Sequence, residues 1–559
     1  MEKIVEAIRT AVQAEFGIDV TPTISVPDGD FGDYATNVAM QIAGRVGDSP
    51  RSIAEKIAQR LDYEANVAGP GFINIRLSDA DVANELNNFL AQPDSYGVSK
   101  AYDKKVVVTE FSDPNPFKVL HIGHLYTSVV GDAISRLIEA AGGAVHRVNF
   151  GGDVGLHVAK NMWAIIQNLG SENPEKLDDV PEAERPDWLA ARYVEGNGAY
   201  GADDQAKLEI VELNKKVYQL FADDDHDTPF AQIYWMARQW SYDYFDRFYE
   251  KIGVEFEKYY PESEGAKIGL PIVREQTKNG VYRESNGAII FDGEPYGLHT
   301  RVFVNSEGLP TYETKDLGCN FQKWDEYHFD QSIIITGNDI VDYMRVLMKS
   351  IEQFQPEIAE RTLHLTHGNV KLSGGVKMSS RLGNFLKAED VLTMTEQAIA
   401  AEQGSSDPDL VLGAIKYAFL RSRLGPDTIY EPETSVSLRG NSGPYLQYAV
   451  ARAKSILRKL NTNVGMSVPA EQDFDEYERA LTMKLLSYGD VVAQATAELA
   501  PHIICTYLYE LAQVFNRFYE NAKVEGNPRQ ALRTQLVYLY MTTMSRGLNL
   551  LGIPVMEKM

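Results

Sequence analysis

The stretch EFSDPNPFKVLHIGHL, from Glu110 to Leu125, joins two elements of different kinds. It follows an apolar run, Val106 to Val108, which predicts a buried parallel strand, and it precedes residues 126–141, whose apolar spacing predicts an amphipathic helix. Two prolines exclude regular structure from the connector between them. The HIGH sequence at 121–124 therefore lies where a strand passes into the first turn of a helix. Backbone N–H groups and the helix dipole favour an anion at such a place.

Strand and helix patterns continue to alternate after this connector. The runs VHRVNF at 145–150 and SIIIT at 332–336 predict two more buried strands. This alternation of strands and helices predicts an α/β fold with a Rossmann-type parallel sheet, whose ligand crevice lies at the carboxyl ends of its strands. Residues 170–300 interrupt this alternation with acidic, tyrosine-rich helical segments. We interpret them as an insertion, after which the sheet resumes near Arg301.

The two ends of the chain have different patterns. Residues 1–100 combine helical patterns at 2–15, 34–46 and 53–61 with a strand-like run at 72–76, which predicts a small α+β domain. After residue 395 the strand patterns disappear and helical patterns run to the end. The sequence therefore predicts three domains, at 1–100, 101–395 and 396–559.

A second motif, GGVKMSSRLG at 374–383, lies far downstream. Two adjacent glycines permit backbone angles that other residues cannot adopt, and four side chains then supply two cations and two hydroxyls. Such a loop could close over a triphosphate and follow its charge as pyrophosphate leaves. Each motif alone also fits an ordinary reading, a pair of surface histidines or a solvated turn. Their occurrence in this order favours a nucleotide site.

These two motifs resemble the HIGH and KMSKS-like motifs of class I aminoacyl-tRNA synthetases. Further segments, spread over nearly the whole chain, are similar to the arginyl-tRNA synthetase family in particular. They are GDYATN at 32–37, GPGFINI at 69–75, EFSDPN at 110–115, PTYETKDLG at 310–318, GNDIVDY at 337–343 and the final RGLNLLGIPVMEKM at 546–559. The resemblance implies an N-terminal tRNA-contacting domain, a class I catalytic domain and a C-terminal α-helical anticodon-binding domain.

The resemblance also implies an activity, the ATP-dependent attachment of L-arginine to tRNA(Arg) through an arginyl adenylate. In that family Mg²⁺ accompanies ATP, and the sequence provides no dedicated protein metal site. The reaction depends on positioning and charge stabilisation rather than on covalent help from the protein. By resemblance the catalytic residues are His121, His124, Lys118, Lys377 and Arg381, and the ATP-binding residues are His121, Gly123, His124, Asp339, Met378, Ser379 and Ser380.

Two departures from the family pattern stand out. Ser380 occupies the position of the second lysine of the usual loop, and we expect Lys118 to replace that cation, as in a subset of the family. Ile340 and Val341 stand where one branch of the family has two histidines. From that segment we retain only Asp339 as a site residue.

Arginine recognition requires acids and a phenol around a planar guanidinium with five N–H donors. By resemblance Tyr312 and Asp316 hold the side chain, and their spacing of four would place them on one face of a helix start. Glu110, Ser112 and Asn115 are expected at the amino-acid end of the substrate. Asp153 is a weaker candidate.

In the C-terminal third, single-stranded bases would stack on aromatic side chains. The expected tRNA contacts are Tyr445, Tyr448, Arg452, Tyr519 and Met559. The net charge of −25 opposes the binding of a phosphate backbone. Because net charge describes the long-range field and not each local surface, we expect basic faces on an acidic protein. The two clusters that predict them are Arg439, Arg452, Lys454, Arg458 and Lys459, and then Arg517, Lys523, Arg529, Arg533 and Arg546.

Composition sets further limits. The chain has 559 residues and two distant cysteines, which suits a reducing cytoplasm, and no zinc-ligand spacing, which argues against the cysteinyl branch of the class. It has no run of about 18 apolar residues and no signal-like start, so we expect no membrane partner. We expect a monomer. Two alternatives remain open: another class I synthetase, or a catalytically retired homologue that binds tRNA.

Overall fold

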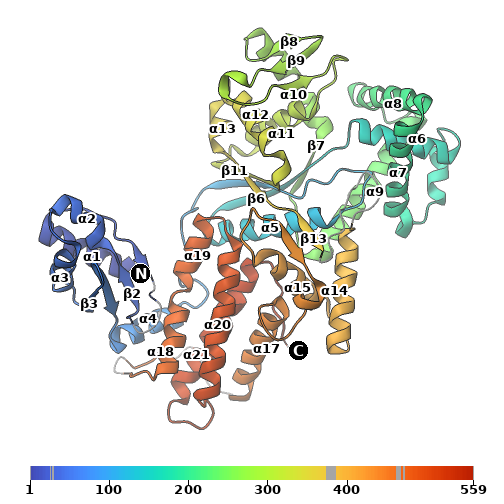
Figure 1. Ribbon diagram of the computed structural model, residues 1–559. Coiled ribbons are helices and arrows are strands. Elements are labelled where there is room, and N and C mark those ends of the chain that lie inside the picture. Colours follow the sequence, from blue (N-terminus) through green and yellow to red (C-terminus); the bar gives the residue numbers. More distant parts are fainter. Residues whose placement is uncertain are drawn as a thin grey trace.

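The computed structural model describes residues 2–25, 27, 31–372, 386–460, 467–469 and 472–557. Figure 1 shows a small N-terminal unit beside a bundle of C-terminal helices, with the parallel sheet and the central part of the chain above that bundle. No helix in these described ranges is long and apolar enough to cross a membrane.

The N-terminal unit is an α+β domain, as the sequence predicts. Its antiparallel sheet has the order β1-β2-β4-β3. The elements are α1 (Glu2–Phe16), β1 (Ile24–Ser25), β2 (Tyr34–Thr36), α2 (Val38–Val46), α3 (Pro50–Ala58), β3 (Glu64–Ala68), β4 (Phe72–Arg76) and α4 (Asp79–Ala91). The prediction of helix over 34–46 is wrong at its start, because Tyr34 to Thr36 pair with β4 and are buried as a strand. The helix begins only after Asn37.

The central sheet has five strands, all parallel, in the order β12-β11-β5-β6-β7. The strands are β5 (Val106–Glu110), β6 (Ala144–Gly151), β7 (Lys258–Pro261), β11 (Gln331–Gly337) and β12 (Thr362–His367). The three strands predicted from apolar runs are confirmed as β5, β6 and β11. Strand β5 is central, with Val108 opposite Ser332 on one side and His146 on the other. The connector after β5 therefore lies at the carboxyl edge of the sheet, where ligands of such sheets bind.

The segment between β6 and β11 differs in part from the predicted insertion. It begins with helical elements: α6 (Leu156–Leu169), the 3₁₀ turns η1 (Pro174–Asp179) and η2 (Glu182–Glu184), α7 (Arg185–Ala202), α8 (Asp204–Ala222) and α9 (Pro229–Ile252). The chain then returns to the main sheet as its edge strand β7. The prediction that the sheet resumes near Arg301 is wrong, because β10 (Arg301–Val304) belongs to a separate antiparallel sheet with β8 (Arg283–Ser285) and β9 (Ala288–Phe291). A short apolar run does not reveal which sheet a strand joins.

Helices α10 (Glu262–Lys278) and α11 (Tyr312–Tyr327) cross in close backbone contact. Glycines allow this approach, since a Cβ on Gly318 would lie 1.9 Å from the Gly265 carbonyl oxygen. The crossing brings the first turns of the two helices together beside the carboxyl edge of the sheet. The remaining elements of this part are the 3₁₀ turns η3 (Glu294–Tyr296) and η4 (Asn338–Ile340), α12 (Val341–Glu352) and α13 (Pro356–Arg361).

The last third is helical apart from one short strand. Strand β14 (Thr428–Tyr430) pairs in parallel with β13 (Val370–Leu372), so the expectation of no strand after 395 misses this element. The helices of this part are α14 (Ala388–Gln403), α15 (Pro408–Leu420), α16 (Pro432–Ser435), α17 (Gly443–Leu460), α18 (Glu476–Leu486), α19 (Tyr488–Ala497), α20 (Pro501–Asn521) and α21 (Gln530–Leu550). Helix α5 (Ile122–Ala140), from the central part of the chain, lies between the sheet and this bundle (Figure 1) and contacts α14, α15, α19, α20 and α21. The predicted boundary between 395 and 396 falls inside α14.

Candidate active site

His121 and His124 cap the start of α5 reciprocally. His121 is the N-cap residue, and its Nδ1 accepts hydrogen bonds from the backbone N–H of Gly123 at 3.0 Å and of His124 at 3.4 Å. The Nδ1 of His124 accepts from the backbone N–H of His121 at 3.1 Å. The two rings stack, with centroids 3.7 Å apart. The sequence predicts that both imidazoles share this helix start, and the structure brings them together there.

This arrangement fixes the protonation of the pair. Burial and the nearby Lys118 ammonium lower the pKa of His121 to about 4. Burial, followed by the charges of His121 and Lys118, lowers the pKa of His124 well below its usual value. Both rings are therefore neutral near pH 7, and because each Nδ1 accepts a backbone N–H, each proton is on Nε2. The pair presents two N–H donors at a helix N-terminus without adding a full positive charge.

Gly123 is required by the stacking of the rings. A Cβ at this position would lie 2.8 Å from Cε1 and 2.9 Å from Nδ1 of His121. Any other residue would push the ring of His121 off the helix start. The glycine therefore has a local structural role, whereas its expected part in ATP binding stays a prediction.

The connector between β5 and α5 is backbone-strained. Ser112, Asp113 and Phe117 all have positive φ, at 76°, 50° and 66°. Such angles in non-glycine residues cost about 1–3 kcal/mol each and persist only where neighbouring contacts impose them. The Ser112 hydroxyl lies 2.7 Å from the hydroxyl of Tyr249, and Asn115 Oδ1 accepts from the backbone N–H of Gly152 at 3.0 Å. Both predicted substrate contacts thus also fasten the connector.

The loop at 374–383, with Lys377, Met378, Ser379, Ser380 and Arg381, lies outside the described residues. The chain that follows it is described and is tied to the first motif. The backbone N–H of Ile122 donates to the Leu386 carbonyl at 3.0 Å, and that of Ala388 donates to the Leu120 carbonyl at 2.9 Å. Residues 386–388, which follow the second motif in the sequence, therefore lie beside the first motif.

Lys118 lies close to this start of α5. Its ammonium is 4.5 Å from the ring centroid of Tyr193, a residue of insertion helix α7. It also lies near enough to affect the protonation of both histidines. The cation that we expect to replace the missing loop lysine is therefore beside the imidazole pair.

Tyr312 and Asp316 lie one turn apart at the start of α11, on one face of the helix, as their spacing predicts. Asp316 Oδ2 accepts a hydrogen bond from the hydroxyl of Tyr343, a residue of α12 that ends the GNDIVDY segment. Burial and the Glu110 and Glu262 carboxylates raise the pKa of Asp316 to about 8, against the opposing hydrogen bond from Tyr343. Tyr312 is more than half exposed and has the Lys315 ammonium 4.7 Å from its ring centroid.

Two buried ion pairs lie under this region, and the sequence analysis missed their lysines. Lys315 Nζ is 2.6 Å from Glu262 Oε2, and Lys323 Nζ is 2.5 Å from Glu110 Oε2. Lys315 and Lys323 both belong to α11. Both lysines are buried in this helix although lysine is rarely buried without a partner. Glu110 is therefore held by an internal cation.

Two histidines of β12 were also missed. His367 Nε2 lies 2.8 Å from the Thr127 hydroxyl of α5, and His364 Nε2 lies 2.8 Å from the Thr336 hydroxyl of β11. Burial lowers the pKa of both rings. Asp339 lies exposed on η4, just past the end of β11. His367, the last residue of β12, and Asp339 are at the carboxyl edge of the sheet.

Asp153 does not belong with the arginine-binding candidates. It is fully buried and its carboxylate is occupied: Arg238 Nε lies 3.0 Å from Oδ2, and Ser263 donates to both oxygens at 2.9 and 2.8 Å. Its role is to join the turn after β6 to helices α9 and α10.

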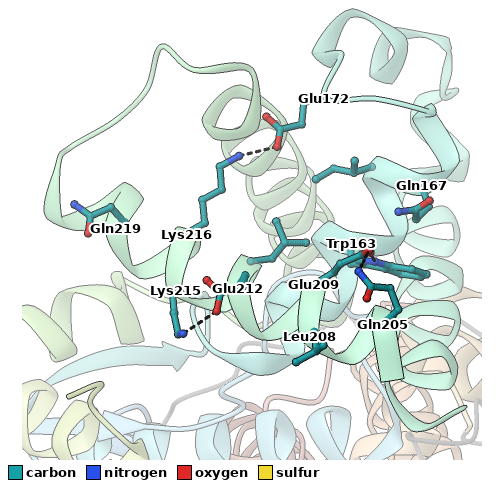
Figure 2. A pocket seen from close by; sticks show the side chains of 12 residues that line it. Trp163, Gln167, Glu172, Gln205, Leu208, Glu209, Glu212, Lys215, Lys216 and Gln219 are labelled. Carbon is teal, nitrogen blue, oxygen red and sulfur yellow. Dashed lines mark hydrogen bonds and ion pairs between the residues drawn. The ribbon is translucent and has the colours of Figure 1, made fainter. Parts of the chain in front are cut away.

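An open groove of about 800 Å³ lies between α6 and α8 (Figure 2). Its walls carry internal pairs, with Trp163 Nε1 donating to Glu209 at 2.8 Å, and Lys216 pairing with Glu172 at 2.6 Å. The groove has none of the predicted site residues.

The predicted tRNA contacts in the described C-terminal region lie on two adjacent helices. Tyr445, Tyr448 and Arg452 are on α17, and Tyr519 is on α20; Met559 lies outside the described residues. The Arg452 guanidinium lies 4.7 Å from the ring centroid of Tyr519, and Asn516 of α20 donates to the Tyr445 hydroxyl at 2.8 Å. Tyr448 is exposed. The structure thus brings Arg452 and Tyr519 into contact.

The second predicted basic cluster is largely neutralised. Arg533 pairs with Glu478 at 2.8 Å and Asp475 at 2.9 Å, and Arg529 binds the same Glu478. Arg546 donates to the carbonyl of Pro93 at 2.8 Å, which ties α21 to the end of α4. The expectation of a free basic face at these three arginines is wrong, because they hold helices together.

The fold and the position of the imidazole pair agree with the expected resemblance to class I tRNA synthetases, and a family profile shows that the chain is a member of this class. The family profile described as "tRNA synthetases class I (R), catalytic domain" matches residues 85–407, more than half of the chain. Profiles for the arginyl tRNA synthetase N terminal domain and the DALR anticodon binding domain match residues 2–77 and 446–559. The chain belongs to the arginyl-tRNA synthetase family.

Known relatives match over nearly their whole length. The arginine–tRNA ligase of Borreliella burgdorferi is 29% identical over 95% of this chain and 94% of its own, and that of Synechococcus sp. is 29% identical over 99% and 98%. Among solved structures, Thermus thermophilus arginyl-tRNA synthetase has a TM-score of 0.79 at 24% identity and covers all of both chains. Plasmodium falciparum arginyl-tRNA synthetase has a TM-score of 0.82 at 21% identity, over 100% and 99%. These two likenesses concern the fold.

Proposed function

We propose that this protein is an arginine–tRNA ligase, which joins L-arginine to tRNA(Arg) through an arginyl adenylate and releases AMP and diphosphate. One observation carries the proposal. Two neutral imidazoles, with their protons on Nε2, stand at the helix start on the carboxyl edge of the sheet, beside an acidic cluster around Asp316. The family to which the chain belongs performs this reaction.

In the first step the carboxylate of arginine attacks the α-phosphorus of ATP and expels diphosphate. The Nε2–H groups of His121 and His124 donate to phosphate oxygens, and the dipole of α5 adds positive potential at the same place. Neutral donors suit this task, because they follow charge that grows in the transition state without binding the ground state as strongly as two imidazolium ions would. Lys118 supplies the cation that the loop residue Ser380 cannot supply.

The remaining ATP contacts are Asp339 on η4 and the loop residues Lys377, Met378, Ser379, Ser380 and Arg381. The loop is part of this proposal because the chain on its far side hydrogen-bonds to residues 120 and 122. Mg²⁺ arrives with ATP.

Arginine is selected by charge and shape. The Asp316 carboxylate, steadied by the Tyr343 hydroxyl, accepts N–H groups of the guanidinium, and the exposed ring of Tyr312 covers the planar cation. Glu110, Ser112 and Asn115 hold the amino-acid end near the start of α5. Lysine would offer no planar fork to this arrangement.

In the second step the terminal ribose hydroxyl of the tRNA attacks the adenylate. The C-terminal helices bind the anticodon, with Tyr448, Arg452 and Tyr519 as stacking surfaces for bases. The enzyme acts as a monomer. We place it in the cytoplasm, because two cysteines without a disulfide framework suit a reducing compartment.

The test is a charging assay on a total tRNA pool with each of the twenty amino acids in parallel, with tRNA present from the start. We expect ATP-dependent esterification with arginine at a kcat/KM at least about 10³-fold above that with any other amino acid, since unpaired polar groups in such a site reject analogues strongly. Charging with a different amino acid, or none with any, would refute the proposal.

A further inference from the structure

The acidic cluster around the arginine site contains more carboxyls than cations. Glu110 and Asp113 come from β5 and the connector after it, Glu262 from α10, and Asp316 from α11. The ammonium groups facing them in the described structure are Lys323, 2.5 Å from Glu110, and Lys315, 2.6 Å from Glu262, and the charge of Lys118 also acts on Glu262. Glu110 and Glu262 are buried and each has its own lysine, whereas Asp113 and Asp316 are partly buried.

Lys323 occupies a distinct place in this cluster. Its side chain is fully buried, and that of Glu110 is 5% exposed. Burial, the largest single effect, lowers the pKa of Lys323, but the charge and hydrogen bond of Glu110, together with the nearby Cys319 and Asp113, outweigh it, and the net pKa lies above the usual value for lysine. Lys323 therefore stays charged, and Glu110 has a fixed counter-ion that cannot reach solvent.

We propose that Lys323 is a positioning residue for arginine recognition: it holds Glu110 as a carboxylate under the amino-acid site and leaves Asp316 as the carboxyl that loses a proton when the guanidinium binds. This inference rests on the proposed function, because it takes arginine as the ligand. The incoming guanidinium adds a further cation to the cluster.

The surroundings of Asp316 agree with this assignment. The groups that face it are Glu110 and Asp113 from β5 and its connector, Glu262 from α10, Tyr312, Cys319 and Lys323 from α11, and Tyr343 from α12. Acids outnumber cations in this set, so the empty site holds a proton. Burial and the neighbouring carboxylates raise the pKa of Asp316 to about 8, and burial and Glu110 raise the pKa of Asp113 well above its usual value.

The proton balance is simple. In the empty site the Asp316 carboxyl keeps its proton. When arginine enters with its guanidinium already charged, the O–H bond of Asp316 breaks, the proton goes to water, and the carboxylate pairs with the guanidinium. Arginine binding should therefore be tighter at higher pH, until Asp316 is already ionised in the empty site.

The test is titration calorimetry of L-arginine into the full-length protein, in buffers of different ionisation enthalpy, which counts protons released per arginine. For the wild type we expect close to one proton at pH 7, falling toward zero above about pH 9. Lys323→Met leaves Glu110 buried without its cation, so that Glu110 takes up a proton in the empty site. We expect the dissociation constant of the Lys323→Met variant for arginine to rise at least about tenfold at pH 7. We also expect this variant to release more protons per bound arginine than the wild type does. Lys323→Arg should return both values to within about threefold of the wild type.

Two further variants keep the inference testable if Lys323→Met does not fold. Glu110→Gln removes the paired carboxylate and leaves the Lys323 cation facing Asp316, so the proton release should fall toward zero. Arg533→Met breaks a similarly buried ion pair with Glu478, outside the catalytic sheet, and should leave arginine affinity and proton release unchanged.

The possible failures are distinguishable. No arginine binding and no charging by the wild type would refute the proposed function itself. Arginine binding by the wild type without proton release would overturn the inference alone. So would a Lys323→Met protein that loses affinity but releases the same number of protons, since that is the result of a purely structural role.

Discussion

Substitution of His121 by asparagine separates two roles of one side chain. His121 Nδ1 accepts the backbone N–H groups of Gly123 and His124 at 3.0 and 3.4 Å, and its Nε2–H is the proposed phosphate donor. Asparagine is among the best N-cap residues, so His121→Asn keeps an acceptor for the helix start but cannot place a donor where Nε2 lies. His121→Ala removes both.

The expected magnitudes follow from this geometry. Loss of one preorganised donor to a developing phosphate charge should cost about 10²–10³ in kcat, equivalent to ~2.7–4 kcal/mol. Loss of the cap should cost about 0.5–2 kcal/mol of stability. We therefore expect both variants to lose adenylate formation to a similar extent, while only the alanine variant becomes less stable.

The assays are arginine-dependent exchange of pyrophosphate into ATP, with tRNA present, and urea unfolding followed by circular dichroism. The matched control is Ser78→Ala. Ser78 caps α4 by accepting from Asp81 at 3.1 Å in the N-terminal domain, so its loss should lower stability without changing kcat. If His121→Asn retains exchange within about threefold of wild type, the assignment of Nε2 to the phosphate is wrong.

The remaining predictions concern the other parts of the site. Asp316→Ala should raise the KM for arginine about 10- to 150-fold, equivalent to ~1.5–3 kcal/mol, and leave the KM for ATP nearly intact in steady-state kinetics; unchanged arginine kinetics would reject the contact. Lys118→Ala should slow pyrophosphate exchange by about 10²-fold. A change smaller than about threefold would mean that another group replaces the loop lysine. Because burial lowers the pKa of His121 to about 4, its neutral form contributes stability that is complete above about pH 6.5 and is lost as pH falls toward 4. The kcat/KM for ATP should therefore show no acidic limb near pH 6.5, and a limb there that His121→Asn removes would contradict the neutral pair. Arg452→Ala should raise the KM for tRNA about 5- to 30-fold and reduce its salt dependence, with arginine kinetics unchanged as the control.

Local patterns predicted the elements around the site well. The apolar runs at 106–108, 145–150 and 332–336 are strands of the main sheet, and the HIGH sequence begins a helix as expected. Burial of apolar runs and capping of a helix start depend on residues close together in the sequence, so a local pattern can predict these features. The edge strand β7 was missed, because its four residues join the sheet only through pairing with distant β6.

Charged residues were harder to assign than apolar ones. Asp153, Arg529 and Arg533 all looked like groups available to ligands, yet each is occupied by partners 51 to 110 residues away in the sequence. Lys323 was overlooked for the same reason, since its partner Glu110 lies 213 residues earlier. Sequence reasoning can name the acids and bases of a site, but it cannot say which of them are already paired.

Helix α5 has consequences for how the chain can be divided. Fourteen of its nineteen residues are buried, and it contacts α14, α15, α19, α20 and α21 as well as strands of the sheet. Lys416 of α15 also fastens the C-terminal segment there by donating to the Gly552 carbonyl at 2.7 Å. A shortened gene that ended after the catalytic segment would strip the apolar cover from the very helix whose first turn bears the imidazoles. The helices after the catalytic segment therefore supply part of the apolar cover of α5, and we expect a chain that lacks them to be less stable at the start of this helix.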